Sequence, residues 1–73
     1  MKYYERMREI RVDSDDTQQA IAAILGISQP QYQLYESGKR NIPVYLLAKF
    51  CEHYQISSDY LLGLTPGLAW PRK

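Results

Sequence analysis

The sequence predicts an all-α fold, with five helices in one compact domain. Apolar residues recur at three- and four-residue spacing along most of the chain, which is typical of helices that bury one face, and no segment alternates like a β-strand. Capping residues, prolines and glycines divide the chain into short helical segments. The length of 73 residues allows one domain, whose limited core makes a deep enzyme cleft unexpected.

The composition excludes several classes of protein. The apolar fraction of 45% and the charged fraction of 23% are those of a globular chain rather than of a disordered one. No apolar run approaches the ~20 residues that a membrane helix needs, and the N-terminal segment is too charged for a signal peptide. A single cysteine cannot form an internal disulfide, which fits a reducing compartment. We therefore expect a soluble, cytoplasmic protein with no membrane partner.

The first helix is expected over residues 3–11. The apolar residues at helical spacing are Tyr4, Met7 and Ile10, and Val12 is expected near the same seam. The acidic segment 13–16 then predicts a turn, after which a new helix begins.

The second helix is expected from Gln18 to about Leu25. Asp16 or Thr17 can cap it, because a side-chain oxygen at this position accepts a free amide of the first turn. Its apolar stripe consists of Ile21, Ile24 and Leu25. Gly26 predicts the end of the helix, since glycine adopts the left-handed conformation at low cost.

The third helix is expected from Ser28 to about Glu36. Ser28 and Gln31 are spaced as a capping-box pair, and Pro30 lies in the first turn, where its missing N–H costs nothing. The residues predicted for the inner face are Tyr32 and Tyr35. The remaining faces carry glutamines, and residues 17–35 contain no charged side chain.

The fourth helix is expected from Pro43 to about Tyr54, and two apolar faces compete as its buried side. One consists of Val44, Leu47, Ala48 and Cys51, and the other of Phe50 and Tyr54. A fifth helix over residues 58–62 is capped by Ser57 and ended by Gly63. Residues 65–73 are expected to form a tail.

Two short helices joined by a tight glycine turn predict a helix-turn-helix. If the motif begins at Gln18, then Ala22 is its fifth residue, where two helices cross and a small side chain is needed, and Gly26 is its ninth, in the turn. The positions that must be apolar are filled by Ile21, Leu25, Ile27, Tyr32 and Tyr35. The residues left pointing outward from the second helix of the motif are Gln29, Pro30, Gln31, Gln33 and Leu34.

Residues 3–64 resemble the Cro/C1-type (Xre) family of bacterial and phage DNA-binding repressors. The resemblance is carried by T-Q-x-x-I-A-x-x-L-G-I-S-Q-x-x-Y-x-x-Y-E-S-G-K-R-x-I-P at residues 17–43, and by the ending YQISSDYLLGLT. It implies a five-helix bundle of the lambda-repressor-like type. The expected organisation is a domain at 1–64, with the motif at about 17–37 and the recognition helix at about 28–36, followed by the tail at 65–73.

The resemblance implies sequence-specific binding of double-stranded DNA and transcription regulation, with repression as the expected mode. The residues it places against base edges are Gln29, Pro30, Gln31, Gln33 and Leu34. The residues it places against phosphates are Thr17, Gln18, Ser28, Lys39, Arg40 and Asn41. Arg11 and Glu36 would form a structural pair. A glutamine amide suits this role, because it can donate to and accept from adenine at the same time.

The sequence departs from the family pattern at three positions. Leu34 replaces a polar reader and could contact a thymine methyl or read nothing. Pro30 cannot donate a hydrogen bond to a base. Asp16 replaces an apolar residue, which predicts a looser turn before the second helix. The first two departures leave the target sequence open.

A homodimer is expected on DNA, because one module buries little surface and carries few charges, and two modules would read an inverted repeat. The competing hypothesis is a protein-interaction module on the same fold, antitoxin-like or an anti-repressor. The net charge of +1 and Leu34 favour that alternative, whereas the glutamines, Lys39 and Arg40 favour DNA.

Neither an enzyme nor a cofactor is expected, because no nucleophile and base can be paired. Cys51 and His53 would face different ways on a helix, and no second cysteine or histidine exists to complete a metal site. Trp70, in the tail, could fold back on the domain or pack on a partner.

Overall fold

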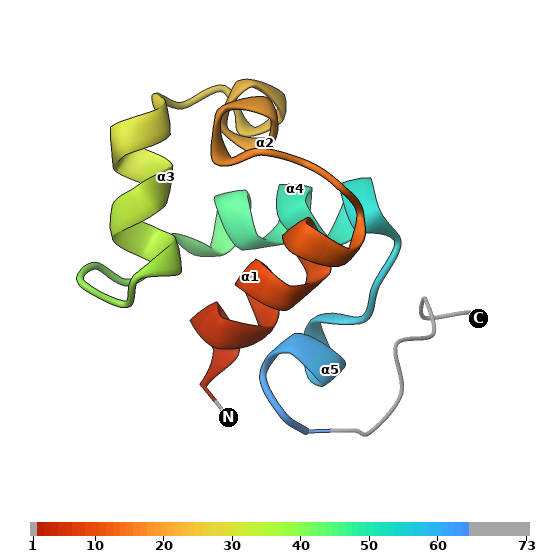
Figure 1. Ribbon diagram of the computed structural model, residues 1–73. Coiled ribbons are helices and arrows are strands. Elements are labelled where there is room, and N and C mark those ends of the chain that lie inside the picture. Colours follow the sequence, from red (N-terminus) through yellow and green to blue (C-terminus); the bar gives the residue numbers. More distant parts are fainter. Residues whose placement is uncertain (1, 65–73) are drawn as a thin grey trace.

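The computed structural model describes residues 2–64, and this part of the chain contains five helices and no strand. The helices are α1 (Tyr3–Asp13), α2 (Gln18–Leu25), α3 (Gln29–Glu36), α4 (Val44–Tyr54) and α5 (Ser58–Leu61) (Figure 1). The predicted all-α class is confirmed. No helix in the described residues is long and apolar enough to cross a membrane. The expected tail and the two alternatives for Trp70 lie outside these residues.

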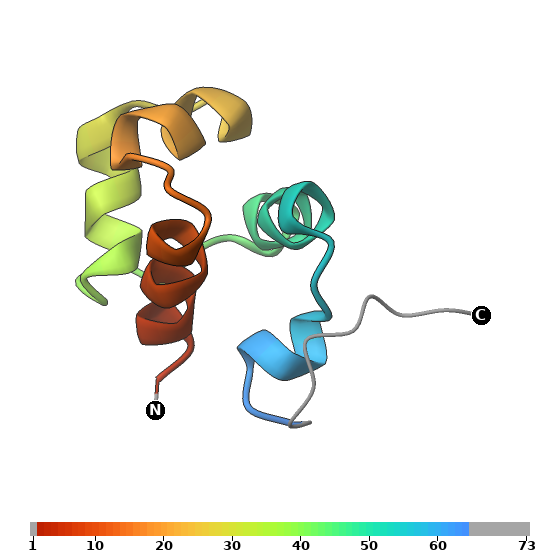
Figure 2. The same ribbon diagram turned by 45° about the vertical axis from the view of Figure 1, so that its right-hand side comes forward.

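The helices surround one core. α1 packs against α3 on one side and α5 on the other, and α4 packs against α2 and α5. α2 lies across one end of α3, while α5 lies at the opposite end of the molecule (Figures 1 and 2). The core consists of Met7, Ile21, Ala22, Leu25, Tyr32, Tyr35, Leu46, Phe50, Cys51, Ile56 and Leu61. α3 lies at the edge of the bundle, and its buried residues Tyr32 and Tyr35 join the core.

The start and end of α2 follow local signals in the sequence. Thr17 caps the helix, since its hydroxyl oxygen accepts the N–H of Ala20 at 3.0 Å. Asp16 does not cap, because its carboxylate accepts a hydrogen bond from the Tyr54 hydroxyl at 2.8 Å instead. At the other end, Gly26 takes a φ of 76°, the left-handed conformation that ends the helix.

The predicted capping box of α3 forms only in part. Ser28 accepts the N–H of Gln31 through its hydroxyl oxygen at 3.2 Å. The reciprocal bond is replaced, because the Gln31 side chain donates to the Tyr35 hydroxyl at 3.0 Å, one turn further along the helix. α3 thus begins at the predicted place, but only one of the two hydrogen bonds of the capping box is formed.

Two apolar predictions, those for Val12 and Ile24, are wrong because one-dimensional spacing does not show what covers a face. Val12 and Ile24 are 46% and 43% exposed, since α1 and α2 turn these residues away from their neighbours. On α4, the buried side includes Leu46 and Phe50, with Tyr54 partly buried. The competing face is divided, because Cys51 is buried and Leu47 is half-buried, whereas Val44 and Ala48 are exposed. α5 ends at Leu61, and Leu62 is 50% exposed.

Candidate nucleic-acid interface

α3 divides its residues between an inner and an outer face. Tyr32, Tyr35 and Glu36 point inward and are buried. The outer face carries the five predicted base contacts: Pro30 and Gln33 are exposed, while Gln29, Gln31 and Leu34 are half-buried. In Figures 1 and 2 this helix forms an edge of the molecule. The outer face of α3 is therefore available to a large partner.

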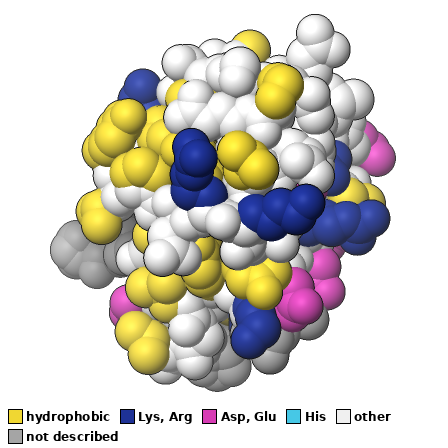
Figure 3. Space-filling model, turned by 90° about the vertical axis from the view of Figure 1, so that its left-hand side faces the viewer, with side chains coloured by type: hydrophobic (Ala, Val, Ile, Leu, Met, Phe, Trp, Pro, Cys, Tyr) yellow, Lys and Arg dark blue, Asp and Glu magenta, His cyan; other side chains and the backbone are white. Residues whose placement is uncertain are grey.

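The predicted phosphate contacts lie around both ends of α3. They are Thr17 and Gln18 at the start of α2, Ser28 before α3, and Lys39, Arg40 and Asn41 after it. All are exposed except Gln18, which is half-buried. Figure 3 shows the side of the molecule on which α3 lies. Its Lys and Arg side chains form a band across this side, and Asp and Glu stay at its margins. The charge distribution there suits an anionic partner better than the net charge suggests.

The loop after α3 folds back onto the helix. The backbone N–H groups of Lys39 and Arg40 both donate to the carbonyl oxygen of Leu34, at 3.1 and 3.2 Å. Gly38 permits this turn with a φ of 80°, and a Cβ atom there would lie 2.5 Å from the ring of Tyr4. Glycine is needed both for the left-handed backbone and for the close approach to α1. The turn holds two basic residues beside the end of α3.

Behind the outer face, Glu36 is the centre of a hydrogen-bonded network. It is 6% exposed, and the Arg11 guanidinium donates to both of its oxygens, from Nε at 2.8 Å and from Nη2 at 3.0 Å. The Tyr32 hydroxyl donates to Oε2 at 2.6 Å, and Gln18 Nε2 donates to Oε1 at 2.9 Å. Four donors satisfy one buried carboxylate, which is the condition for burying a charge without a large penalty.

These contacts set the protonation state of Glu36. Burial alone would raise the pKa of its carboxyl, but the hydrogen bonds from Arg11, Tyr32 and Gln18 together hold that pKa below its usual range. In return, burial and the hydrogen bond to Glu36 raise the pKa of Tyr32. The network therefore keeps an ionised carboxylate and a protonated phenol at neutral pH.

The carboxylate also fixes the orientation of two glutamine amides. Because Glu36 can only accept, Gln18 must turn its NH₂ group toward it, and the Gln18 carbonyl then faces α3. That carbonyl accepts from Gln29 Nε2 at 2.6 Å. Within residues 2–64, the Gln29 carbonyl oxygen and its second N–H have no hydrogen-bond partner. This acceptor and donor pair matches N6 and N7 of adenine.

The other two glutamines of the outer face are held less firmly. Gln31 donates to Tyr35 on its own helix at 3.0 Å. Gln33 is exposed, and its side chain makes no hydrogen bond to the rest of the described residues. The three glutamines therefore differ in preorganisation, with Gln29 the most constrained.

Sequence reasoning missed three contacts that support this face. Arg11 Nη1 donates to the backbone carbonyl of Asp16 at 2.8 Å, and the Asp16 carboxylate accepts from Tyr54. These two bonds hold the turn before α2, where Asp16 led us to expect looseness. The hydroxyl of Tyr32 bonds to Glu36, although the residue was expected only to fill the core. The four-residue spacing of Tyr32 and Glu36 is the signal that could have indicated that bond.

Residues 2–64 contain no group of three His, Cys, Asp or Glu side chains that could hold a metal ion. Cys51 is buried in α4, where burial raises the pKa of its thiol, and His53 is exposed on the same helix.

Comparison with known proteins agrees with this geometry. A family model described as helix-turn-helix matches residues 7–61, which is more than half of the chain. A relative named "Uncharacterized HTH-type transcriptional regulator YobD", from Bacillus subtilis (strain 168), is 33% identical over 63 residues. The matched region covers 86% of this chain and 56% of the relative, so the chain spans little more than half of that protein's length. No solved structure matches the chain.

Proposed function

This chain belongs to the Xre family of helix-turn-helix DNA-binding transcription regulators, and on that premise we propose that it is a repressor that binds an inverted-repeat operator as a homodimer. The observation that carries the proposal is the series of hydrogen bonds from Glu36 through Gln18 to Gln29. It presents an oriented amide on the open face of α3. A preorganised amide loses little conformational freedom when it binds a base.

In the proposed complex the outer face of α3 lies in the major groove. Gln29 forms two hydrogen bonds with adenine, and Gln31 and Gln33 meet the neighbouring base edges. Pro30 and Leu34 contribute apolar contacts, for which the methyl group of thymine is the matching partner.

The ends of α3 and α2 meet the sugar-phosphate backbone in this proposal. The N-terminus of α2 presents backbone N–H groups and the side chains of Thr17 and Gln18 to one phosphate. Ser28 offers its hydroxyl at the start of α3. On the other side, Lys39, Arg40 and Asn41 hold the backbone past the end of α3. These contacts fix the register of the helix, and the glutamines read the sequence.

A dimer gives this small interface sufficient affinity and specificity. Residues 1–64 form the proposed DNA-binding unit, and each unit neutralises about two or three phosphates. Two units reading half-sites about 34 Å apart double that number and also double the length of sequence that is read. Occupation of a promoter by such a dimer excludes polymerase, which is the proposed mode of repression.

The proposal can be tested by selecting the duplexes that the protein binds from a random pool of double-stranded DNA at physiological salt. We expect one inverted repeat to emerge, with half-sites about one helical turn apart. A single half-site without its repeat would contradict the dimer, and an unselective pool from protein that is helical by circular dichroism would contradict base reading. The second result would favour the alternative of a protein-interaction module, with α3 buried against a protein partner.

A further inference from the structure

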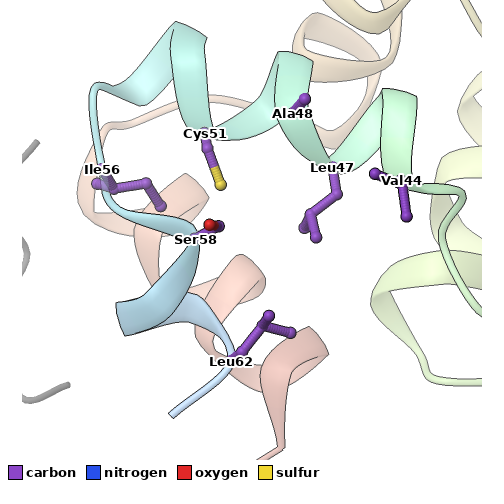
Figure 4. A pocket seen from close by; sticks show the side chains of 7 residues that line it. All are labelled: Val44, Leu47, Ala48, Cys51, Ile56, Ser58 and Leu62. Carbon is purple, nitrogen blue, oxygen red and sulfur yellow. The ribbon is translucent and has the colours of Figure 1, made fainter. Parts of the chain in front are cut away.

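An apolar groove lies between α4 and the segment around α5, away from α3 (Figure 4). It encloses about 420 Å³. Its apolar lining consists of Val44, Leu47, Ala48 and Cys51 from α4, with Ile56 and Leu62 from the other side. In Figure 4 the side chains of Leu47 and Leu62 point toward the same space. Ser58 is the one polar residue among the seven that line the groove. The groove therefore suits an apolar occupant.

The lining of this groove includes the α4 stripe that the sequence marks as a second buried face. The stripe has the spacing of a core face, yet only part of it is covered within residues 2–64: Cys51 is buried and Leu47 is half-buried, whereas Val44 and Ala48 are exposed. Val44 is 80% exposed, and Leu62 and Leu64 are 50% and 71% exposed. Contiguous exposed apolar surface of this kind marks an interaction site.

The chain itself contains an occupant of suitable chemistry. Residues 65–73 read TPGLAWPRK and contain two large apolar residues, Leu68 and Trp70. The described residues end at Leu64, two positions beyond Leu62, which is one wall of the groove. Trp70 is eight residues beyond Leu62, a tether that spans up to about 26 Å when extended, so the whole groove is within its reach.

Three physical arguments support this segment as the occupant, and the first of them also disfavours a second copy of the chain. A short tether gives the segment an effective concentration of about millimolar, whereas a second copy loses its full translational freedom on binding. Pro66 and Pro71 flank the apolar residues and restrict the backbone, which reduces the entropy lost on docking. A tryptophan ring also removes about 150–250 Å² of its own surface from water when it fills a pocket.

We propose that residues 65–73 of the same chain dock in this groove, with Trp70 inserted between α4 and Leu62. The docking completes the domain by covering the exposed part of the α4 stripe. It is independent of DNA binding, because the residues that line the groove come from α4 and from the segment around α5, and none of them lies on α3.

Fluorescence tests the docking directly, because Trp70 is the only tryptophan in the chain. In the wild-type protein we expect a blue-shifted emission and strong protection from acrylamide quenching, both independent of protein concentration. Ala48→Glu places a charge in the groove at an exposed position. It should shift the emission to the red and increase the quenching constant several-fold. NMR should also detect contacts between the Trp70 ring and the methyl groups of Val44 and Leu62 in the wild-type protein.

The matched control is Ala23→Glu, the same substitution at an exposed position on α2. It should leave the emission and the quenching of Trp70 unchanged. Circular dichroism verifies that both variants are folded. A solvent-exposed emission in the wild-type protein would overturn the proposal, as would full protection in folded Ala48→Glu. Protection that appears only as protein concentration rises would assign the groove to a second copy and would equally overturn it.

Discussion

At the scale of single residues, the network behind α3 connects the stability of the fold with the orientation of the proposed base reader. Glu36 receives donors from α1, α2 and its own helix, so it holds three helices together. The same carboxylate determines which way the amides of Gln18 and Gln29 face. A substitution in this network can therefore affect folding, DNA reading or both, and the experiments must separate the two.

Gln29→Ala should weaken binding to the selected operator by about 1–3 kcal/mol and relax the preference at one base position. The reason is that the substitution removes both hydrogen bonds to adenine and leaves the phosphate contacts in place. Titration of the operator and of its single-base variants measures the effect. Gln19→Ala, at an exposed glutamine that is not among the proposed base contacts, serves as the control and should bind all of them like the wild type. An equal loss by Gln29→Ala on every duplex would contradict base reading.

Glu36 should make the stability of the domain depend on acid pH. Its pKa is lowered in the folded state, so the unfolded chain binds the proton first as the pH falls. The stabilisation is complete above the unfolded pKa of about 4.3, and below it is lost at up to about 1.4 kcal/mol per pH unit until the folded pKa is passed. Urea unfolding at a series of pH values measures this loss.

Glu36→Gln should show a flatter acid dependence and a lower stability at neutral pH, where Arg11 loses its ionic partner. Removal of one partner of a buried pair costs about 3–5 kcal/mol, which can unfold a domain this small. NMR titration of the Glu36 carboxyl carbon in the wild-type protein gives the folded pKa without any variant. A value at or above that of a free glutamate would contradict the prediction.

At the scale of elements, the turns around α3 determine where its neighbours lie. Gly26 and Gly38 both adopt left-handed backbone conformations, with φ values of 76° and 80°. They differ in their surroundings. A Cβ atom at Gly26 would have no heavy atom within 4 Å, whereas one at Gly38 would overlap the Tyr4 ring. The turn at Gly26 requires glycine only for its left-handed backbone conformation. The turn at Gly38 requires it also because a side chain would overlap the Tyr4 ring.

Gly26→Ala should therefore destabilise the domain by about 1–2 kcal/mol, the cost of the left-handed conformation for alanine. Gly38→Ala should cost more, because the ring of Tyr4 or the loop must also move. Urea unfolding of the two variants provides the comparison, and each serves as the control of the other. Equal losses would show that the Tyr4 ring moves aside freely. Gly38→Ala should also weaken DNA binding, since its loop carries Lys39 and Arg40.

At the scale of the whole molecule, the modest net charge of +1 conceals an uneven distribution. The side that carries α3 has a band of Lys and Arg (Figure 3), and the groove between α4 and α5 is apolar. The molecule thus has two surfaces of different chemistry. The first is suited to an anion such as DNA, and the second to an apolar segment.

Salt dependence tests the proposed dimer as a whole. If it neutralises about four to six phosphates, the slope of log K against log salt concentration should be about −4 to −5. Arg40→Ala should weaken binding to all duplexes alike and flatten the slope by about one unit per protomer. Lys49→Ala, on α4, is a control of similar charge and should leave the slope unchanged. An unchanged slope for Arg40→Ala would show that this residue meets no phosphate.

The sequence by itself determined the helices and the division of α3 into two faces. Capping residues, glycines and apolar spacing are local features, so they located α2 and α3 and the buried positions of Tyr32 and Tyr35. The motif also identified the residues of the proposed interface, because their positions follow from the start of the helices.

Tertiary packing decided the contacts between residues that are distant in sequence. The hydrogen bond between Asp16 and Tyr54 is one such contact. The hydrogen bonds of Gln18 to Glu36 and to Gln29 are two more. Packing also determined that Val12 and Ile24 are exposed. In α4 the buried residues are Leu46, Phe50 and Cys51, while Val44 and Ala48 of the competing stripe remain exposed in the wall of a groove. Spacing along a helix shows which faces are apolar, but the helices that pack against each face determine which one is covered.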